Sequence, residues 1–252
     1  RIEEYGCYKK NMKDECRWSC SSCDALKNIK KCIRNPKHEA SISENSTNYL
    51  FNNLIKNYGA VSHSSETWII TIDDVLNEED CDKIINSIDS AQWSPSLAGD
   101  GKLPARTSST YWCESFFCRK NTQKLREWVN DKMKISDEYA EPLQILRYNK
   151  EEYYKSHHDQ NSPRSSAWGP RIYTVFFYLS DVEEGGETNF PTVNVTIKPK
   201  KGSILIWSNI LNEDVNKRDE KTSHQSLPVI KGTKFSANYW LHLYPYKLYN
   251  GC

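Results

Sequence analysis

Apolar residues after position 66 alternate with their neighbours over several short runs. In the first run Trp68, Ile70 and Ile72 share one parity, which predicts a β-strand. Similar runs follow at residues 143–148, 171–179, 193–197, 203–208 and 235–243. Short strands separated by turn-forming residues, with few helices, favour an antiparallel sandwich or jelly roll over a parallel doubly wound sheet.

Two segments instead show the spacing of amphipathic helices. The first follows Asn77, a residue type that caps helix N-termini, and the second is predicted to start at Asn121. Their apolar stripes are Cys81, Ile84, Ile85 and Ile88 in the first helix, and Leu125, Trp128, Val129 and Met133 in the second. We interpret both stripes as surfaces that pack against the core of a mainly β (α+β) domain.

Polar segments divide the chain into three parts: a cysteine-rich segment of residues 1–32, a linker of residues 33–66, and a large domain of residues 67–252. The linker is rich in Asn and Ser, and only residues 50–55 suggest an amphipathic turn. Long polar loops interrupt the large domain at residues 94–105, 160–169 and 209–222. Loops of this length in a compact domain are often lids or binding loops.

Composition narrows the possible partners. The formal net charge is +1, which implies no large electrostatic preference for nucleic acid or an anionic membrane surface, and we expect no nucleic acid among the partners. No apolar run approaches the ~20 residues that a membrane-spanning helix needs. The sequons Asn45-Ser-Thr47 and Asn194-Val-Thr196 fit a secreted protein.

The cysteines point to an oxidising compartment. Five of the nine fall within the first 32 residues, which predicts a small disulfide-rich segment. A zinc site is the alternative, because Cys20 and Cys23 have the spacing of metal ligands. Further along the chain, Cys113 and Cys118 could bond to each other, whereas Cys81 is expected to pack as a small hydrophobe.

Residues 153–160 read YYKSHHDQ and carry a candidate metal site. Residues two apart in a strand point to the same side, so His157 and Asp159 can converge on one atom while His158 points away. His224, between two strand runs, is the best candidate for a third ligand. Two imidazoles and one carboxylate are the ligand set of non-haem Fe(II) oxygenases. The alternative is a solvated loop with a local Asp–His hydrogen bond.

Three further side chains could bind the carboxylate of a ligand near that metal. Lys234 opens a strand run downstream of His224 and offers a positive charge. Thr188, after a Gly-Gly-Glu sequence, and Tyr148, at the end of a strand run, offer hydroxyl groups. Each also has a plain structural explanation, as a surface lysine, a turn threonine and a packed tyrosine.

The stretch from about Trp68 to Tyr246 resembles the catalytic domain of prolyl 4-hydroxylases, which are Fe(II)- and 2-oxoglutarate-dependent dioxygenases. The resemblance is carried, in the family's order, by LRY at 146–148, YKSHHD at 154–159, RIYT at 171–174, FYLSDVEEGGET at 177–188, PKKG at 199–202, His224, PVIKGTK at 228–234 and WLH at 240–242. It implies a double-stranded β-helix, a jelly-roll form, with helices packed on one outer face.

The resemblance also assigns roles to individual residues. The implied iron ligands are His157, Asp159 and His224. Lys234 would bind the C5 carboxylate of 2-oxoglutarate, with Thr188 and Tyr148 as hydroxyl partners. The positions expected to contact a peptide are Arg171, His242 and Trp240. Lysyl hydroxylases resemble this set but place Arg where Lys234 stands, which favours the prolyl branch.

The implied reaction hydroxylates C4 of a peptidyl proline with O₂ and 2-oxoglutarate and releases succinate and CO₂. It needs Fe(II), with ascorbate as an accessory cofactor, and no side chain acts as a general base. We expect a proline-containing peptide or protein as substrate, and the secretory pathway, in particular the endoplasmic reticulum lumen, as location. The alternatives are hydroxylation of Lys or Asn on the same scaffold and a catalytically silent binding module.

The cysteine-rich start of the chain has a resemblance of its own. Residues 7–23 look like the end of a ShK-toxin-like domain, a six-cysteine module sometimes joined to prolyl hydroxylases. The first part of that module is missing here. In the silent alternative, this segment would bind a partner.

Overall fold

The computed structural model describes residues 33–89, 92–96, 105–162 and 166–249 of the chain. The predicted disulfide-rich, partly ShK-like segment of residues 1–32 lies outside the described residues. So do residues 97–104 of the predicted loop at 94–105. The fold below therefore concerns most of the predicted linker and of the large domain.

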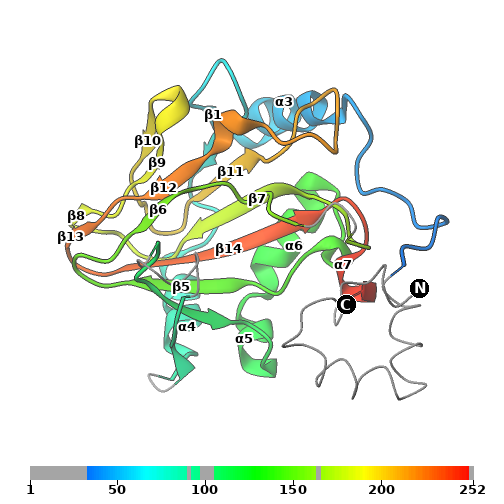
Figure 1. The fold of residues 1–252 in the computed structure, drawn as a ribbon. Helices are drawn as coiled ribbons and strands as arrows, with labels where there is room; N and C mark the ends of the chain where they lie inside the picture. Colours follow the sequence, from blue (N-terminus) through cyan, green and yellow to red (C-terminus); the bar gives the residue numbers. More distant parts are fainter. Residues whose placement is uncertain (1–32, 90–91, 97–104, 163–165, 250–252) are drawn as a thin grey trace, which may run out of the picture.

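An eight-stranded sheet forms the centre of the molecule (Figure 1). Its strands follow the order β1-β2-β11-β7-β14-β5-β4-β3, and each pairs antiparallel with its neighbour. In that order the strands are Val61–Ser62, Ile69–Ile72, Ile204–Ser208, Arg171–Tyr178, Lys234–His242, Gln144–Tyr148, Ser109–Trp112 and Ser94–Pro95.

A four-stranded antiparallel sheet lies against one side of the large sheet (Figure 1). Its order is β10-β9-β12-β6, with strands Val195–Ile197, Thr188–Phe190, His224–Ser226 and Tyr154–His157. A third pair joins β13 (Val229–Lys231) to β8 (Glu184–Gly185). Two antiparallel sheets packed face to face confirm the prediction of a jelly-roll core.

Helices cover the other side of the large sheet. The α-helices are α3 (Ser46–Tyr58), α4 (Glu78–Asn86), α5 (Phe116–Asn121), α6 (Gln123–Met133) and α7 (Tyr246–Tyr249). Short 3₁₀ turns are η4 (Asp137–Tyr139), η5 (Pro191–Val193) and η6 (Glu220–Thr222). None of the helices in the described part of the chain is long and apolar enough to cross a membrane.

The alternating side chains of the large sheet divide the core in two. In β7, Tyr173, Val175 and Phe177 face the helices, in one cluster with α3, α4 and α6. Phe176 and Tyr178 face the small sheet and belong to a second cluster. This period of two is what a strand buried on both faces produces. The space between the two sheets is where the candidate site lies.

Both predicted helices are present. Asn77 caps α4, because its side chain accepts a hydrogen bond from the backbone N–H of Asp80 at 2.8 Å. The second predicted helix corresponds to α6, which starts at Gln123 rather than at Asn121. The buried residues of the two helices are Cys81 and Ile84 in α4, and Leu125, Val129 and Met133 in α6.

The prediction of a linker was wrong for residues 46–58. They form α3, a helix of 13 residues, where the sequence suggested a single turn. Phe51 and Leu54 are fully buried in the same cluster as the large sheet. Burying such side chains contributes about 1.5–3 kcal/mol each, which ties this helix to the domain. Its apolar face is short, and the packing partner that stabilises it lies far along the chain.

Three cysteines of the large domain lie in the described residues, and they behave as expected. Cys113 and Cys118 form a disulfide across the turn into α5. Cys81 is a buried free thiol, and burial raises its pKa to about 11, so it packs as an unreactive side chain.

Candidate functional site

The structure brings the three predicted metal ligands together. In the β6–β12 pair, His157 lies directly opposite His224. Nε2 of His157 is 3.6 Å from Oδ1 of Asp159, and Nε2 of His224 is 3.8 Å from Oδ2 of the same carboxylate. One ligand atom from each of the three residues lies within 4.8 Å of the other two. Because β6 ends at His157, Asp159 reaches the cluster from just beyond the strand.

Backbone carbonyls fix how the two imidazoles face the cluster. Nδ1 of His157 is 2.9 Å from the carbonyl oxygen of Lys155, and Nδ1 of His224 is 3.0 Å from that of Thr222. Donation of the Nδ1 proton to each carbonyl leaves the Nε2 lone pair free for a metal. Burial and the neighbouring His157 ring lower the pKa of His224 to about 3, so its ring is neutral at physiological pH.

Asp159 is held as an ionised carboxylate by its surroundings. The hydroxyl of Thr174 donates to Oδ2 at 2.7 Å and itself accepts from Nδ2 of Asn209 at 2.9 Å. Burial alone would raise the pKa of the Asp159 carboxyl, but His224, His157 and Arg171 hold it well below its usual range. Two imidazoles and an ionised carboxylate that converge on one point fit Fe(II).

Lys234 lies in the same cavity as the histidine cluster. Its side chain is fully buried at the start of β14, and Nζ donates to Oγ of Ser226 at 3.0 Å. Nζ also lies 5.3 Å from the ring centre of Tyr148. Burial lowers the pKa of the Lys234 ammonium to about 7. The lining of this cavity includes His157, His224, Lys234, Tyr148 and Thr188.

Thr188 starts β9 and points into this cavity, so it is not merely a turn residue. Its hydroxyl accepts a hydrogen bond from Tyr178 at 2.8 Å, which leaves its own proton available for a further acceptor. Gly186, two residues before Thr188, has φ +72°, and a Cβ there would lie 3.2 Å from the side chain of Val229. The positive φ therefore favours glycine at this position, and the absent Cβ leaves room for the Val229 side chain.

The three predicted peptide-contacting residues cluster beside the metal ligands and are already paired. Glu141 accepts two hydrogen bonds from the Arg171 guanidinium, at 2.5 and 3.0 Å, and lies 2.8 Å from Nε2 of His242. The Arg171 guanidinium also stacks 4.0 Å from the Trp240 ring centre and donates to the carbonyl of Asp159 at 3.2 Å. Arg171 and His242 thus shape one wall rather than standing free.

Sequence reasoning missed two charged members of this region. Glu141 joins Arg171 to His242, from positions 30 and 101 residues away in the chain, and no local pattern indicates such a contact. Arg106 lines the cavity with only 8% of its surface exposed, and one of its guanidinium nitrogens has no hydrogen-bond partner among the described residues. The role of Thr174 could have been predicted, because it is a polar residue that points to the same side of its strand as Phe176 and Tyr178.

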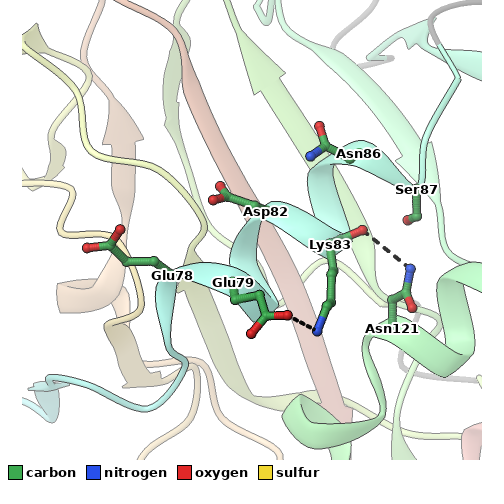
Figure 2. Close-up of a pocket in the computed structure, with 7 residues that line it drawn as sticks. All are labelled: Glu78, Glu79, Asp82, Lys83, Asn86, Ser87 and Asn121. Atoms are coloured by element: carbon green, nitrogen blue, oxygen red, sulfur yellow. Dashed lines mark hydrogen bonds and ion pairs between the residues drawn. The ribbon is translucent and has the colours of Figure 1, made fainter.

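A second hollow lies on α4, on the outer surface (Figure 2). Its acidic residues are explained by helix electrostatics, because Glu78 and Glu79 lie in the first turn of the helix. Glu79 is 2.6 Å from Nζ of Lys83, and Asp82 pairs with Lys201 at 2.8 Å. The hollow therefore offers paired surface charges and no convergent ligand set.

Comparison with known proteins agrees with this geometry. Residues 143–242 match the model of the 2OG-Fe(II) oxygenase superfamily. The chain is 32% identical over 200 residues to "Probable prolyl 4-hydroxylase 10" of Arabidopsis thaliana, covering 69% of this chain and 68% of that protein. It is 30% identical over 186 residues to "Prolyl 4-hydroxylase subunit alpha-1" of Rattus norvegicus, covering 69% of this chain and 34% of that subunit.

A solved structure is similar in both sequence and fold. It is the 2OG complex of the viral collagen prolyl hydroxylase of Paramecium Bursaria Chlorella virus-1, with 32% identity and a TM-score of 0.55. The match covers 71% of this chain and 98% of the viral chain. The chain therefore belongs to the prolyl 4-hydroxylase family and is an Fe(II)- and 2-oxoglutarate-dependent dioxygenase.

Proposed function

We propose that this protein hydroxylates C4 of peptidyl proline, with Fe(II) held by His157, Asp159 and His224. The observation that carries the proposal is the shared cavity, which joins the histidine cluster to the buried Lys234. His157 and His224 both line that cavity, so the cluster is open toward it. Bound Fe(II) would supply the redox chemistry that couples O₂ reduction to decarboxylation of 2-oxoglutarate and hydroxylation of the substrate.

Lys234 is proposed to bind the C5 carboxylate of 2-oxoglutarate. Its partner Ser226 lies two residues along β12 from His224, a separation of about 7 Å in an extended strand. That separation is comparable with the length of a C5 dicarboxylate. The hydroxyls of Thr188 and Tyr148 line the same end and would donate to the carboxylate. A carboxylate bound here would also supply a counter-charge to the buried ammonium.

Arg171, Trp240 and His242 are proposed to form the wall that the peptide contacts. Glu141 and the Trp240 ring hold the Arg171 guanidinium in one orientation, so little side-chain entropy remains to be lost when a peptide binds. The indole N–H of Trp240 is buried and has no hydrogen-bond partner among the described residues. Side chains on this wall orient the substrate and exclude water; none is required to move a proton.

Peptide turnover tests the proposal. The full chain, supplied with Fe(II), 2-oxoglutarate and ascorbate, should release succinate and add the mass of one oxygen atom to proline-rich peptides. Matched peptides with Ala in place of Pro should gain no oxygen. Oxygen on Lys or Asn instead would favour the alternative hydroxylases. No turnover on any peptide would contradict the proposal and favour the silent binding module.

We also propose that the protein passes through the secretory pathway to the endoplasmic reticulum lumen, where ascorbate would keep the iron reduced. The Cys113–Cys118 disulfide and the exposed sequon at Asn194 support this location. Expressed from its native gene in a eukaryotic cell, the protein should lose mass on treatment with an N-glycosidase. The double variant Asn45→Gln/Asn194→Gln should remove that change, because it lacks both sequons. A wild-type protein without glycan would count against the location.

A further inference from the structure

His158 lies between two of the proposed metal ligands but faces a buried hydrogen-bond network. Its side chain is 9% exposed. Nδ1 accepts the backbone N–H of Gln160 at 2.9 Å, so the ring proton lies on Nε2. Nε2 is 2.9 Å from the carbonyl oxygen of Asp219 and 3.1 Å from the hydroxyl oxygen of Thr222. The imidazole therefore joins two segments that are 61 residues apart in the sequence.

The second segment leads directly to a metal ligand. Thr222 is fully buried, and its hydroxyl donates to the carbonyl of Asp219 at 3.0 Å. The carbonyl of Thr222 in turn accepts the Nδ1 proton of His224. A continuous series of contacts thus runs from the His158 ring, through Thr222, to the ring of His224.

The strand pairing stops where these contacts begin. The paired residues of β6 and β12 end with His157 opposite His224, and the register is irregular between His224 and Ser226. Asp159 lies past the last paired residue. The hydrogen bonds of His158 therefore connect the two ligand-bearing segments on the side that the strand ladder does not reach.

We propose that His158 is a positioning residue of the metal centre, which fixes Asp159 relative to His224 by bonding Gln160 on one segment and the 219–222 turn on the other. The inference rests on the proposed ligand set. Loss of a side chain that orients a metal ligand typically weakens metal binding by about 10–100-fold. His158 acts through its neighbours and contacts neither metal nor substrate.

Cobalt titration of the full chain tests this role. His158→Phe keeps a ring of similar size but offers neither the acceptor nor the donor, so we expect Co(II) to bind about 10–100-fold more weakly. His158→Gln can still donate an amide hydrogen to the Asp219 carbonyl and should recover most of the affinity. The visible Co(II) absorption should also change in the Phe variant, since the ligand geometry is altered.

Thr47→Val is the matched control for a general loss of stability. It removes another buried hydrogen bond, between Thr47 and the hydroxyl of Tyr173 at 2.8 Å, on α3. This variant should unfold at a lower temperature while binding Co(II) as tightly as the wild type. Unchanged Co(II) affinity in His158→Phe, or an equal loss in Thr47→Val, would overturn the positioning role.

His224→Ala separates this inference from the ligand set on which it rests. It should abolish Co(II) binding if the ligands are as proposed. Wild-type affinity in that variant would overturn the ligand set, and the positioning role with it. Loss of binding in His224→Ala together with full binding in His158→Phe would overturn the positioning role alone.

Discussion

Asp159→Asn should remove metal binding and reduce succinate formation to the level of a reaction without enzyme. The substitution keeps the size of the side chain and an oxygen that can accept from Thr174, but it removes the charge that a divalent cation requires. Because the affected group is itself a proposed ligand, the loss of Fe(II) affinity should exceed the roughly 100-fold typical of an outer-shell partner. Equilibrium dialysis against Fe(II) without oxygen measures it.

Asp73→Asn provides the control for that substitution. It makes the same chemical change at an exposed carboxylate that pairs with Lys200 at 2.6 Å. Surface pairs of this kind contribute about 0–1 kcal/mol, so metal binding and turnover should stay at wild-type levels. Retained Fe(II) binding in Asp159→Asn would show that the carboxylate is not a ligand.

Lys234→Met should weaken the binding of 2-oxoglutarate while leaving metal binding intact. Methionine fills a similar volume but leaves the C5 carboxylate buried without a counter-charge. Removing one partner of such a pair costs about 2–5 kcal/mol, which corresponds to a roughly 30- to several-thousand-fold increase in the dissociation constant. Calorimetric titration of 2-oxoglutarate into the Mn(II)-loaded protein measures the change.

The same substitution should stabilise the protein when 2-oxoglutarate is absent. The pKa of Lys234 is about 7 in the folded protein and about 10.4 in the unfolded chain. At a pH between these two pKa values, unfolding therefore takes up a proton. The buried ammonium therefore destabilises the folded protein fully below pH 7, and this destabilisation disappears as the pH rises through about 10.4. Lys234→Met removes it, so the free energy of unfolding at pH 7 should rise by a few kcal/mol.

Lys231→Met is the matched control, because this lysine is exposed on β13 and pairs with Glu183 at the surface. It should change neither 2-oxoglutarate affinity nor stability appreciably. If Lys234→Met bound 2-oxoglutarate as tightly as the wild type, Lys234 would not be the carboxylate partner.

The sequence predicted those features that depend on residues close together in the chain or on the order of motifs. Strand parity places His157 and Asp159 on one side, and the motif order links them to His224 and Lys234. Each of these rests on a local pattern or on spacing along the chain. The jelly-roll core was predictable for the same reason, since alternation of apolar residues is a local property.

Contacts between distant segments could not be predicted in this way. Parity indicated that His158 points away from the metal ligands, but not that its ring reaches Asp219 and Thr222. Helix α3 was interpreted as a linker because its Asn-rich sequence shows only a short apolar face. Its stability comes from Phe51 and Leu54 packing against strands that occur much later in the chain.

The most direct test of the proposed function is to identify the oxidised amino acid after a reaction under ¹⁸O₂. A proline-rich peptide incubated with the full chain, Fe(II), ascorbate and 2-oxoglutarate should yield 4-hydroxyproline on hydrolysis. Its hydroxyl group should carry ¹⁸O, and one hydroxyl group should form for each succinate released in a turnover that hydroxylates the peptide. The Asp159→Asn variant should yield no 4-hydroxyproline. A label on another residue, or 4-hydroxyproline formed equally by Asp159→Asn, would contradict the proposed reaction or its metal centre.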